Sequence, residues 1–376
     1  MALILTIAMA VTTLTSLLLL SRWGNVRCTG PMPVSFFTFF AILFTSGLDV
    51  GLIMFPLVDF ELYVREAEYG FANPLAFEFG FWGFLVWAFY FLTTFYFCIV
   101  EPKLKLFQIP AIRFTNNIVI IGTCAFTAFL LLLYLPGYIF GIGPVFRYGL
   151  VAAVILFAVL SSTDIKYVKI LSVTSTLIFF ALIAGAWLVS GMGLSGLFST
   201  MGQISEYFTN LHRFLTPISD YHQFYLYWWF AWSIMIGQFV ARFVGGIKAW
   251  QLLAALLIVP SIPIAIWFSV LYYYFSGALQ VGPVLRFSMV VVGVIFVINS
   301  LDSLIRLYTT NLDATPERFG RMRYILGNWL MLSVLVILYQ FTPLKIEWIG
   351  LIVVAIYTAV YWLVFRRRHQ LSEATS

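Results

Sequence analysis

The stretch of sequence that decides the fold is residues 222–244, which read HQFYLYWWFAWSIMIGQFVARFV. Trp228 and Trp232 are four residues apart, and Trp229 and Trp232 are three apart, so a helix would place the three indoles on one side. Such a stripe either fills an apolar membrane helix and its interfacial aromatic belt, or presents ring faces that hold a cation. The rest of the chain decides between these two interpretations.

The composition places this stripe in a polytopic membrane protein. Of the 376 residues, 62% are apolar and only 10% are charged, and the mean hydropathy is +0.99. No soluble domain of this length tolerates such values. The formal charge of +6 then reflects membrane topology, and nothing indicates nucleic acid. The cysteines and histidines lack metal-ligand spacing, and no enzyme motif is present, so we expect neither an enzyme nor a bound metal.

Eleven segments have about the apolar length that a transmembrane helix needs. They are residues 1–21, 33–58, 75–100, 117–136, 147–161, 168–190, 222–243, 251–276, 284–308, 322–342 and 346–365. The first segment has no positive region before it and no cleavage site of small residues. We therefore expect it to be a retained helix and not a signal peptide.

The charged residues divide unequally between the two sides that eleven crossings define. Cytoplasmic loops collect Lys and Arg. With the N-terminus outside, 16 of the 21 basic residues fall on the inner side. The outer loop after 33–58 carries four acids, which are Asp59, Glu61, Glu66 and Glu68. The charges therefore predict an N-terminus outside and a cytoplasmic tail that includes 366–369.

Residues 195–221 are too polar to span a membrane but repeat their apolar side chains at helical spacing. The repeating residues are Leu197, Met201, Ile204, Phe208, Leu211 and Leu215. The spacing predicts an amphipathic helix in the outer interface.

The aromatic stretch resembles the signature of the betaine/choline/carnitine transporter family, which reads roughly F-Y-x-x-W-W-x-x-W-S-P-x-x-G-x-F-x-A-R. The matching residues are Phe224, Tyr225, Trp228, Trp229, Trp232, Ser233, Gly237, Phe239, Ala241 and Arg242, followed by Val259, Pro260, Trp267, Phe268 and Ser269. Three features depart from the signature. The proline is Ile234, the next position is Met235, and the basic loop is replaced by residues 244–247, VGGI.

This resemblance implies an all-α fold with a LeuT-like core of two five-helix inverted repeats. Residues 21–27 resemble the segment after the family's second helix, so we expect the usual first helix to be lacking. The expected units are an N-terminal helix and cytoplasmic loop (1–32), a first repeat (33–194), an outer amphipathic helix (195–221), a second repeat (222–366) and a cytoplasmic tail (367–376). The family's assembly implies a homotrimer.

Within 33–58, residues 44–52 read FTSGLDVGL and resemble the family's F-x-A-G-M-G-I-G-L. Gly47 and Gly51 weaken the helix, and unwound backbone is tolerated in a membrane only where it lines a cavity. The alternative is close packing of small residues. The resemblance then places Leu48 and Asp49 at the substrate site. An acid at bilayer depth costs roughly 2.5–3.5 kcal/mol, so Asp49 is a functional candidate.

Residues 81–90, FWGFLVWAFY, resemble the family's H-W-G-x-x-x-W-A-x-Y. A quaternary ammonium has no N–H to donate, so a site recognises it through ring faces. The resemblance implies an aromatic box for such a group. Its walls would be Trp82, Trp87, Tyr90 and Trp229, with Trp228 and Trp232 beside them and Phe224 and Phe239 as gates.

Residues 295–303, IFVINSLDS, resemble the family's I-F-F-V-T-S-A-D-S. The resemblance implies one sodium site formed by Phe296, Asn299, Ser300 and backbone oxygens of 33–58. The family's second sodium site should be lost, because residues 126–133, FTAFLLLL, are mostly apolar. Asp302 is expected to be a structural cap. Coupling then uses either a proton on Asp49 or one sodium at Ser300, and the cost of burying Asp49 favours the proton.

These features together favour secondary active transport of choline, glycine betaine, carnitine or a similar solute across a prokaryotic inner membrane. Asp49 favours choline or another net cation over a zwitterion. The departures from the family leave a second hypothesis open. In that alternative, the protein is a degenerate homologue that binds a ligand or partner protein without transport.

Overall fold

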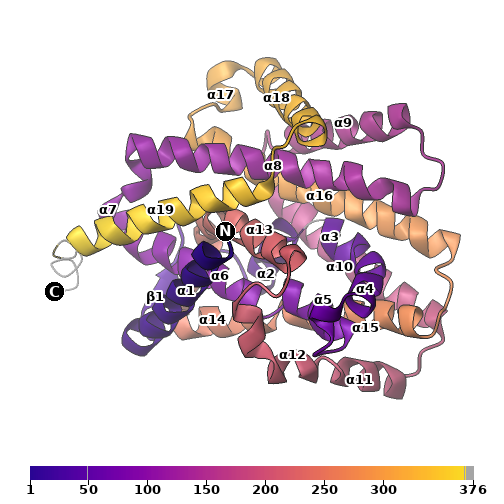
Figure 1. Ribbon diagram of the computed structural model, residues 1–376. Helices are drawn as coiled ribbons and strands as arrows, with labels where there is room; N and C mark the ends of the chain where they lie inside the picture. The colour runs from indigo at the N-terminus through magenta and orange to yellow at the C-terminus, as the bar shows by residue number, and fades with distance from the viewer. Residues whose placement is uncertain (49, 368, 370–376) are drawn as a thin grey trace.

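The computed structural model describes residues 1–48, 50–367 and 369, and these are predominantly helical (Figure 1). Within this part, nine helical segments are long and apolar enough to cross a membrane. They are α1 (Ala2–Trp23), the segment Pro74–Leu104, α8 (Pro110–Tyr138), α9 (Pro144–Ser161), α10 (Lys166–Ser190), the segment Ala249–Ser276, α16 (Pro283–Asn311), α18 (Arg321–Phe341) and α19 (Ile346–Arg366). These nine coincide with nine of the eleven expected spans.

The other two expected spans behave differently from the nine. Span 222–243 is the single helix α13 (Asp220–Val240), whose many Trp, Tyr and Gln side chains lower its hydropathy. Span 33–58 is divided into α2 (Phe36–Gly47), α3 (Val50–Met54) and α4 (Pro56–Arg65). The total of eleven crossings and the division into two repeats of five therefore stay predictions.

Three of the expected spans are interrupted inside the bundle. Helix α2 ends at Gly47, and Leu48 is extended (φ −129°, ψ 153°). Segment Pro74–Leu104 divides into helices that separate at Gly83 and Phe84, and segment Ala249–Ser276 separates at Val259 and Pro260. Their parts are α5 (Pro74–Trp82), α6 (Leu85–Phe95), the π-helical turn η2 (Tyr96–Val100) and α7 (Glu101–Leu104), and α14 (Ala249–Ile258) and α15 (Ser261–Ser276).

The last two interruptions meet in space. The backbone N–H of Phe84 donates to the Ser261 hydroxyl at 2.9 Å. Phe84 has φ +47°, a region that bulky residues avoid. Such backbone costs of order 1–3 kcal/mol and persists where the surroundings enforce it. The contact therefore joins α5–α6 to α14–α15 at a strained point.

A short antiparallel ribbon joins two connections that are far apart in sequence. Strand β1 (Arg27–Thr29) pairs with β2 (Gly245–Lys248), with Cys28 opposite Ile247. Gly246 has φ +77°, and Arg27 donates to its carbonyl oxygen at 3.0 Å. The segment that replaces the family's basic loop thus supplies one strand of this ribbon.

The expected amphipathic helix at 195–221 is three short helices instead of one. They are α11 (Leu194–Gly202), α12 (Ser205–Thr209) and η4 (Leu211–Leu215). Leu197 and Ile204 are buried, as the periodicity predicts, but Phe208 is exposed. Helix α11 packs on α15 and α12 packs on α5, so this segment covers the bundle where α5 begins.

Helices α8 and α16 are the two longest and pack along each other through the centre of the bundle (Figure 1). Helix α13 lies between α6 and α19 and is buried along nearly its whole length. Short helices complete the described part, and they are η1 (Ala67–Tyr69), η3 (Leu106–Gln108), η5 (Ala241–Phe243) and α17 (Pro316–Phe319). The Trp-rich helix is therefore a core element rather than a lipid-facing one.

Candidate substrate and ion site

The interruption after α2 presents backbone oxygens to α16. The Ser300 hydroxyl lies 2.7 Å from the Leu48 carbonyl oxygen and 3.3 Å from that of Thr45. Carbonyls in the last turn of a helix lack intrahelical partners and carry partial negative charge. One hydroxyl and two carbonyl oxygens, all buried, thus converge on one point. This is the kind of oxygen set that holds a small cation at a broken membrane helix.

The other residues expected at this point are also on α16. Asn299 is buried, and its Nδ2 donates to Ser172 on α10 at 3.4 Å. Its Oδ1 finds no hydrogen-bond partner among the described residues. The Phe296 ring is buried against Phe44, with 6.2 Å between ring centroids. Asp49, the other candidate for coupling and substrate binding, lies outside the described residues.

Three of the box tryptophans form one cluster. The Trp82 ring lies edge-on to Trp228 and Trp229, at centroid distances of 5.5 and 5.1 Å. Trp228 and Trp229 stack at 5.3 Å with 10° between their planes. The Trp229 indole N–H donates to the Phe81 carbonyl at 2.7 Å, which ties α13 to the last turn of α5. Helices α5 and α13 thus hold these rings in a fixed geometry.

Trp87 and Tyr90 form a second cluster, which contacts the end of α2. Their rings are perpendicular, 5.2 Å apart. A Cβ atom on Gly47 would lie 3.5 Å from the Tyr90 ring and 3.6 Å from the Trp87 ring. These two walls therefore lie one residue from Leu48, whose carbonyl contacts Ser300. The expected substrate and ion residues adjoin each other at the end of α2.

The rings are closed off from solvent. All six rings, those of Trp82, Trp87, Tyr90, Trp228, Trp229 and Trp232, are at most 1% exposed. Phe224 is half-buried and lies at one end of the stripe, 5.7 Å from Trp228. Phe239 is buried at the other end, 5.3 Å from Phe243. The rings are therefore packed in the interior, with a phenylalanine at each end of the stripe.

Two further expectations concern α8 and Asp302. Residues 126–133 belong to α8, and most of their side chains are apolar. The hydroxyl of Thr127 donates to the carbonyl oxygen of Thr123 in the same helix. Asp302 pairs with Arg306 at 2.9 Å, and Arg306 also donates to the Ser161 and Asp164 carbonyls, both at 3.0 Å. Asp302 thus helps to fasten α16 to the end of α9, as a structural residue would.

The sequence did not predict a buried polar cluster around Asp59 and Glu78. Asp59 is 3% exposed and accepts hydrogen bonds from Tyr221 and Tyr225 at 2.8 and 3.2 Å, so its expected place in an open outer loop is wrong. It lies on α4, the last of the three helices into which the expected span 33–58 is divided. Glu78 on α5 is fully buried and accepts from Tyr63 at 2.8 Å. The only signal was the spacing of Tyr221 and Tyr225, four residues apart.

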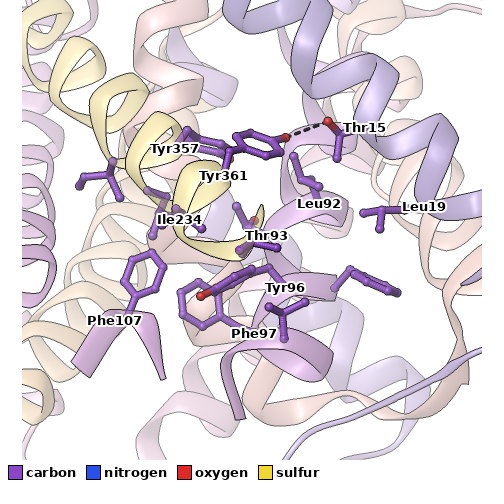
Figure 2. A pocket seen from close by; sticks show the side chains of 15 residues that line it. Thr15, Leu19, Leu92, Thr93, Tyr96, Phe97, Phe107, Ile234, Tyr357 and Tyr361 are labelled. Atoms are coloured by element: carbon purple, nitrogen blue, oxygen red, sulfur yellow. Dashed lines mark hydrogen bonds between the residues drawn. The ribbon is translucent and has the colours of Figure 1, made fainter. Parts of the chain in front are cut away.

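A separate apolar groove lies on the flank of the bundle. Its volume is about 130 Å³, and it runs between α1, α6 and α19 (Figure 2). The Tyr361 hydroxyl donates a hydrogen bond to the Thr15 hydroxyl oxygen across the groove at 3.0 Å. No box residue lines this groove, so it is not part of the candidate site.

Comparisons with known proteins find transporters that are similar to this chain. A model of the betaine/carnitine/choline transporter family matches residues 119–274, which include all of α13. The glycine betaine transporter OpuD of Bacillus subtilis (strain 168) is 26% identical over 277 residues, which cover 62% of this chain. The match spans only about half of that relative, 54% of its length.

A solved structure shows the same fold. It is the substrate-bound outward-open state of a Na⁺-coupled sialic acid symporter, with a TM-score of 0.52 over 94% of this chain and 85% of that one, at 15% identity. The apolar helices make this chain a multi-pass membrane protein, and the matching family consists of transporters and not enzymes. This chain is therefore similar to the betaine/carnitine/choline transporter family over residues 119–274, and it shares its fold with the solved symporter.

Proposed function

We propose that this protein is a secondary active transporter that carries a quaternary ammonium solute of the choline, glycine betaine or carnitine type by alternating access. One observation carries the proposal: the buried rings of Trp87 and Tyr90 lie against Gly47, beside the backbone oxygens that Ser300 contacts. Ring faces attract a trimethylammonium group, each for about 0.5–2 kcal/mol. An ion bound at the neighbouring oxygens would be coupled to the solute through the same helix end.

Coupling to a single sodium ion is favoured by this geometry. Thr45, Leu48 and Ser300 supply three oxygens, and the Oδ1 of Asn299 on the same helix has no partner among the described residues. An unsatisfied buried acceptor costs free energy, and a cation would remove that cost. The sequence had favoured a proton on Asp49. The oxygens at Ser300 favour the other alternative.

Two inverted five-helix repeats are supported by the interrupted helices. In the proposed division, α5–α7 is the second helix of the first repeat and α14–α15 that of the second. Both are interrupted after a first helix of similar length, 9 residues in α5 and 10 in α14, and the interruptions touch at Phe84 and Ser261. Related positions that meet near one axis are expected of inverted repeats.

The setting of the protein is proposed along with its function. The excess of basic residues supports an N-terminus outside and a C-terminus in the cytoplasm of a prokaryotic cell. A homotrimer is part of this proposal, by analogy with the family that the sequence resembles. A cysteine placed at position 2 should react with an impermeant thiol reagent on intact cells, and one placed at 370 should react only after lysis. The reverse result would overturn the orientation.

The test of the site is binding of choline and glycine betaine to purified variants, measured by calorimetry. Trp229→Leu and Trp87→Leu should each weaken binding by about 1–2 kcal/mol, and Trp229→Phe should cost less because a ring face remains. Trp362→Leu is the matched control, since Trp362 is 57% exposed. Equal losses for Leu and Phe at position 229, or losses in the control alone, would count against the box.

A further inference from the structure

Two buried carboxylates occupy the end of the bundle where α4 is connected to α5. Asp59 and Glu78 come from these two helices and are 3% and 0% exposed. Asp59 accepts hydrogen bonds from the hydroxyl groups of Tyr221 and Tyr225, and Glu78 accepts one from the hydroxyl group of Tyr63. The Oε1 of Glu78 is buried and finds no hydrogen-bond partner among the described residues. One carboxylate oxygen of the cluster is therefore a buried hydrogen-bond acceptor without a donor among the described residues.

The two carboxylates lie directly beside the aromatic box. Glu78 precedes Trp82 by four residues on α5, so the two side chains lie on the same face of the helix. Tyr225, which donates to Asp59, lies 5.6 Å from the Trp82 ring. Phe55, one turn before Asp59, contacts Trp82 at 6.0 Å. The pair therefore lies at the α4–α5 end of the ring cluster.

No cation of the described part balances these charges. Neither carboxylate takes part in an ion pair among the described residues. Arg286 on α16 contacts other groups. Its guanidinium lies 4.7 Å from the centroid of the Phe140 ring and donates to the carbonyl oxygen of Val281. The side chains around the pair are tyrosines and other aromatic rings. Buried carboxylates without a cationic partner take up either protons or a cation from outside.

We propose that Asp59 and Glu78 form a cation-selecting site at the entrance of the box, which accepts the ammonium head of a net-cationic solute such as choline and disfavours zwitterions such as glycine betaine. The inference rests on the proposed function. A quaternary ammonium cannot donate a hydrogen bond, so charge and ring faces are what remain to recognise it. The carboxylate of a zwitterion is repelled by the same pair, and this repulsion provides specificity.

The test compares choline with glycine betaine in one calorimetric assay on the full-length protein. The wild-type protein should bind choline more tightly than glycine betaine. Glu78→Gln and Asp59→Asn, which keep the size of each side chain, should weaken choline binding at least about tenfold and leave glycine betaine unchanged or tighter. Glu61→Gln is the control, because Glu61 lies on α4 but is exposed. It should leave the ratio of the two affinities unchanged.

The ratio of the two affinities separates selection from folding, because loss of folded protein alters both titrations alike. A wild-type preference for glycine betaine would overturn the inference without any variant. Equal changes for both ligands in Glu78→Gln would overturn it too, and the proposed function would stand if the Trp229 variants still lost binding. If the wild type binds neither compound, the proposed function itself fails, and the inference fails with it.

Discussion

Gly237 lies where α6 and α13 come into close contact, and one added methyl group there tests how the box is held together. A Cβ atom on Gly237 would lie 2.2 Å from the Thr93 hydroxyl oxygen and 2.8 Å from the Thr93 carbonyl carbon. Rotation of the Thr93 side chain can relieve the first contact, but the backbone contact cannot be relieved in this way. Carbon atoms settle near 3.5–4.0 Å, so Gly237→Ala must separate the two helices by roughly 1 Å.

The expected cost follows from these distances. Overpacking of this kind costs about 1–3 kcal/mol. The hydrogen bond from the Thr93 hydroxyl to the Ser233 carbonyl, 2.8 Å long, is disturbed as well and is worth about 1 kcal/mol. Alanine recovers up to about 1 kcal/mol through its higher helix propensity. We expect a net loss of about 1–3 kcal/mol and a displacement of Trp87 on α6 relative to Trp229 on α13.

Thermal unfolding in detergent and choline binding measure the two effects. Gly185→Ala on α10 and Gly327→Ala on α18 are matched controls, because a Cβ atom at either position meets nothing within 4 Å. The controls should unfold at or slightly above the wild-type temperature and bind choline normally, whereas Gly237→Ala should unfold earlier and bind more weakly. If Gly237→Ala behaves like the controls in both measurements, α6 and α13 do not pack as described.

Two further predictions concern single side chains. Ser300→Ala should abolish sodium-stimulated uptake in proteoliposomes while choline binding without sodium changes little, and retained stimulation would exclude Ser300 as an ion ligand. Arg306→Met leaves the buried Asp302 without its partner and should cost about 3–5 kcal/mol of stability, which a cost below 1 kcal/mol would contradict.

Local sequence patterns predicted the helices and one of the interruptions. Apolar length located nine spans, because each helix satisfies its own backbone hydrogen bonds in a membrane. The largest difference is at α8, which begins at Pro110 and not at residue 117. Gly47 and Gly51 predicted the interruption at Leu48, and the resemblance brought Ser300 to the same point. These features are encoded within short stretches or in a motif, so a sequence without structure can reveal them.

Features that depend on distant partners could not be predicted. The interruption at Phe84 is enforced by Ser261, which is 177 residues away. Asp59 reads as a loop acid until Tyr221 and Tyr225 fold over it from α13. The ribbon between β1 and β2 is too short to leave a pattern, and its strands are separated by most of the chain. In each case the decisive contact is tertiary and has no local signature.

Counterflow of labelled choline into proteoliposomes tests the central claim most directly. Vesicles loaded with unlabelled choline should accumulate the label transiently above its external concentration, because an alternating-access carrier exchanges one solute for the other. Trp229→Leu should lose this accumulation, and the exposed-site control Trp362→Leu should keep it. Saturable binding with no accumulation, for choline and glycine betaine alike, would contradict transport and identify the protein as a homologue that only binds its ligand.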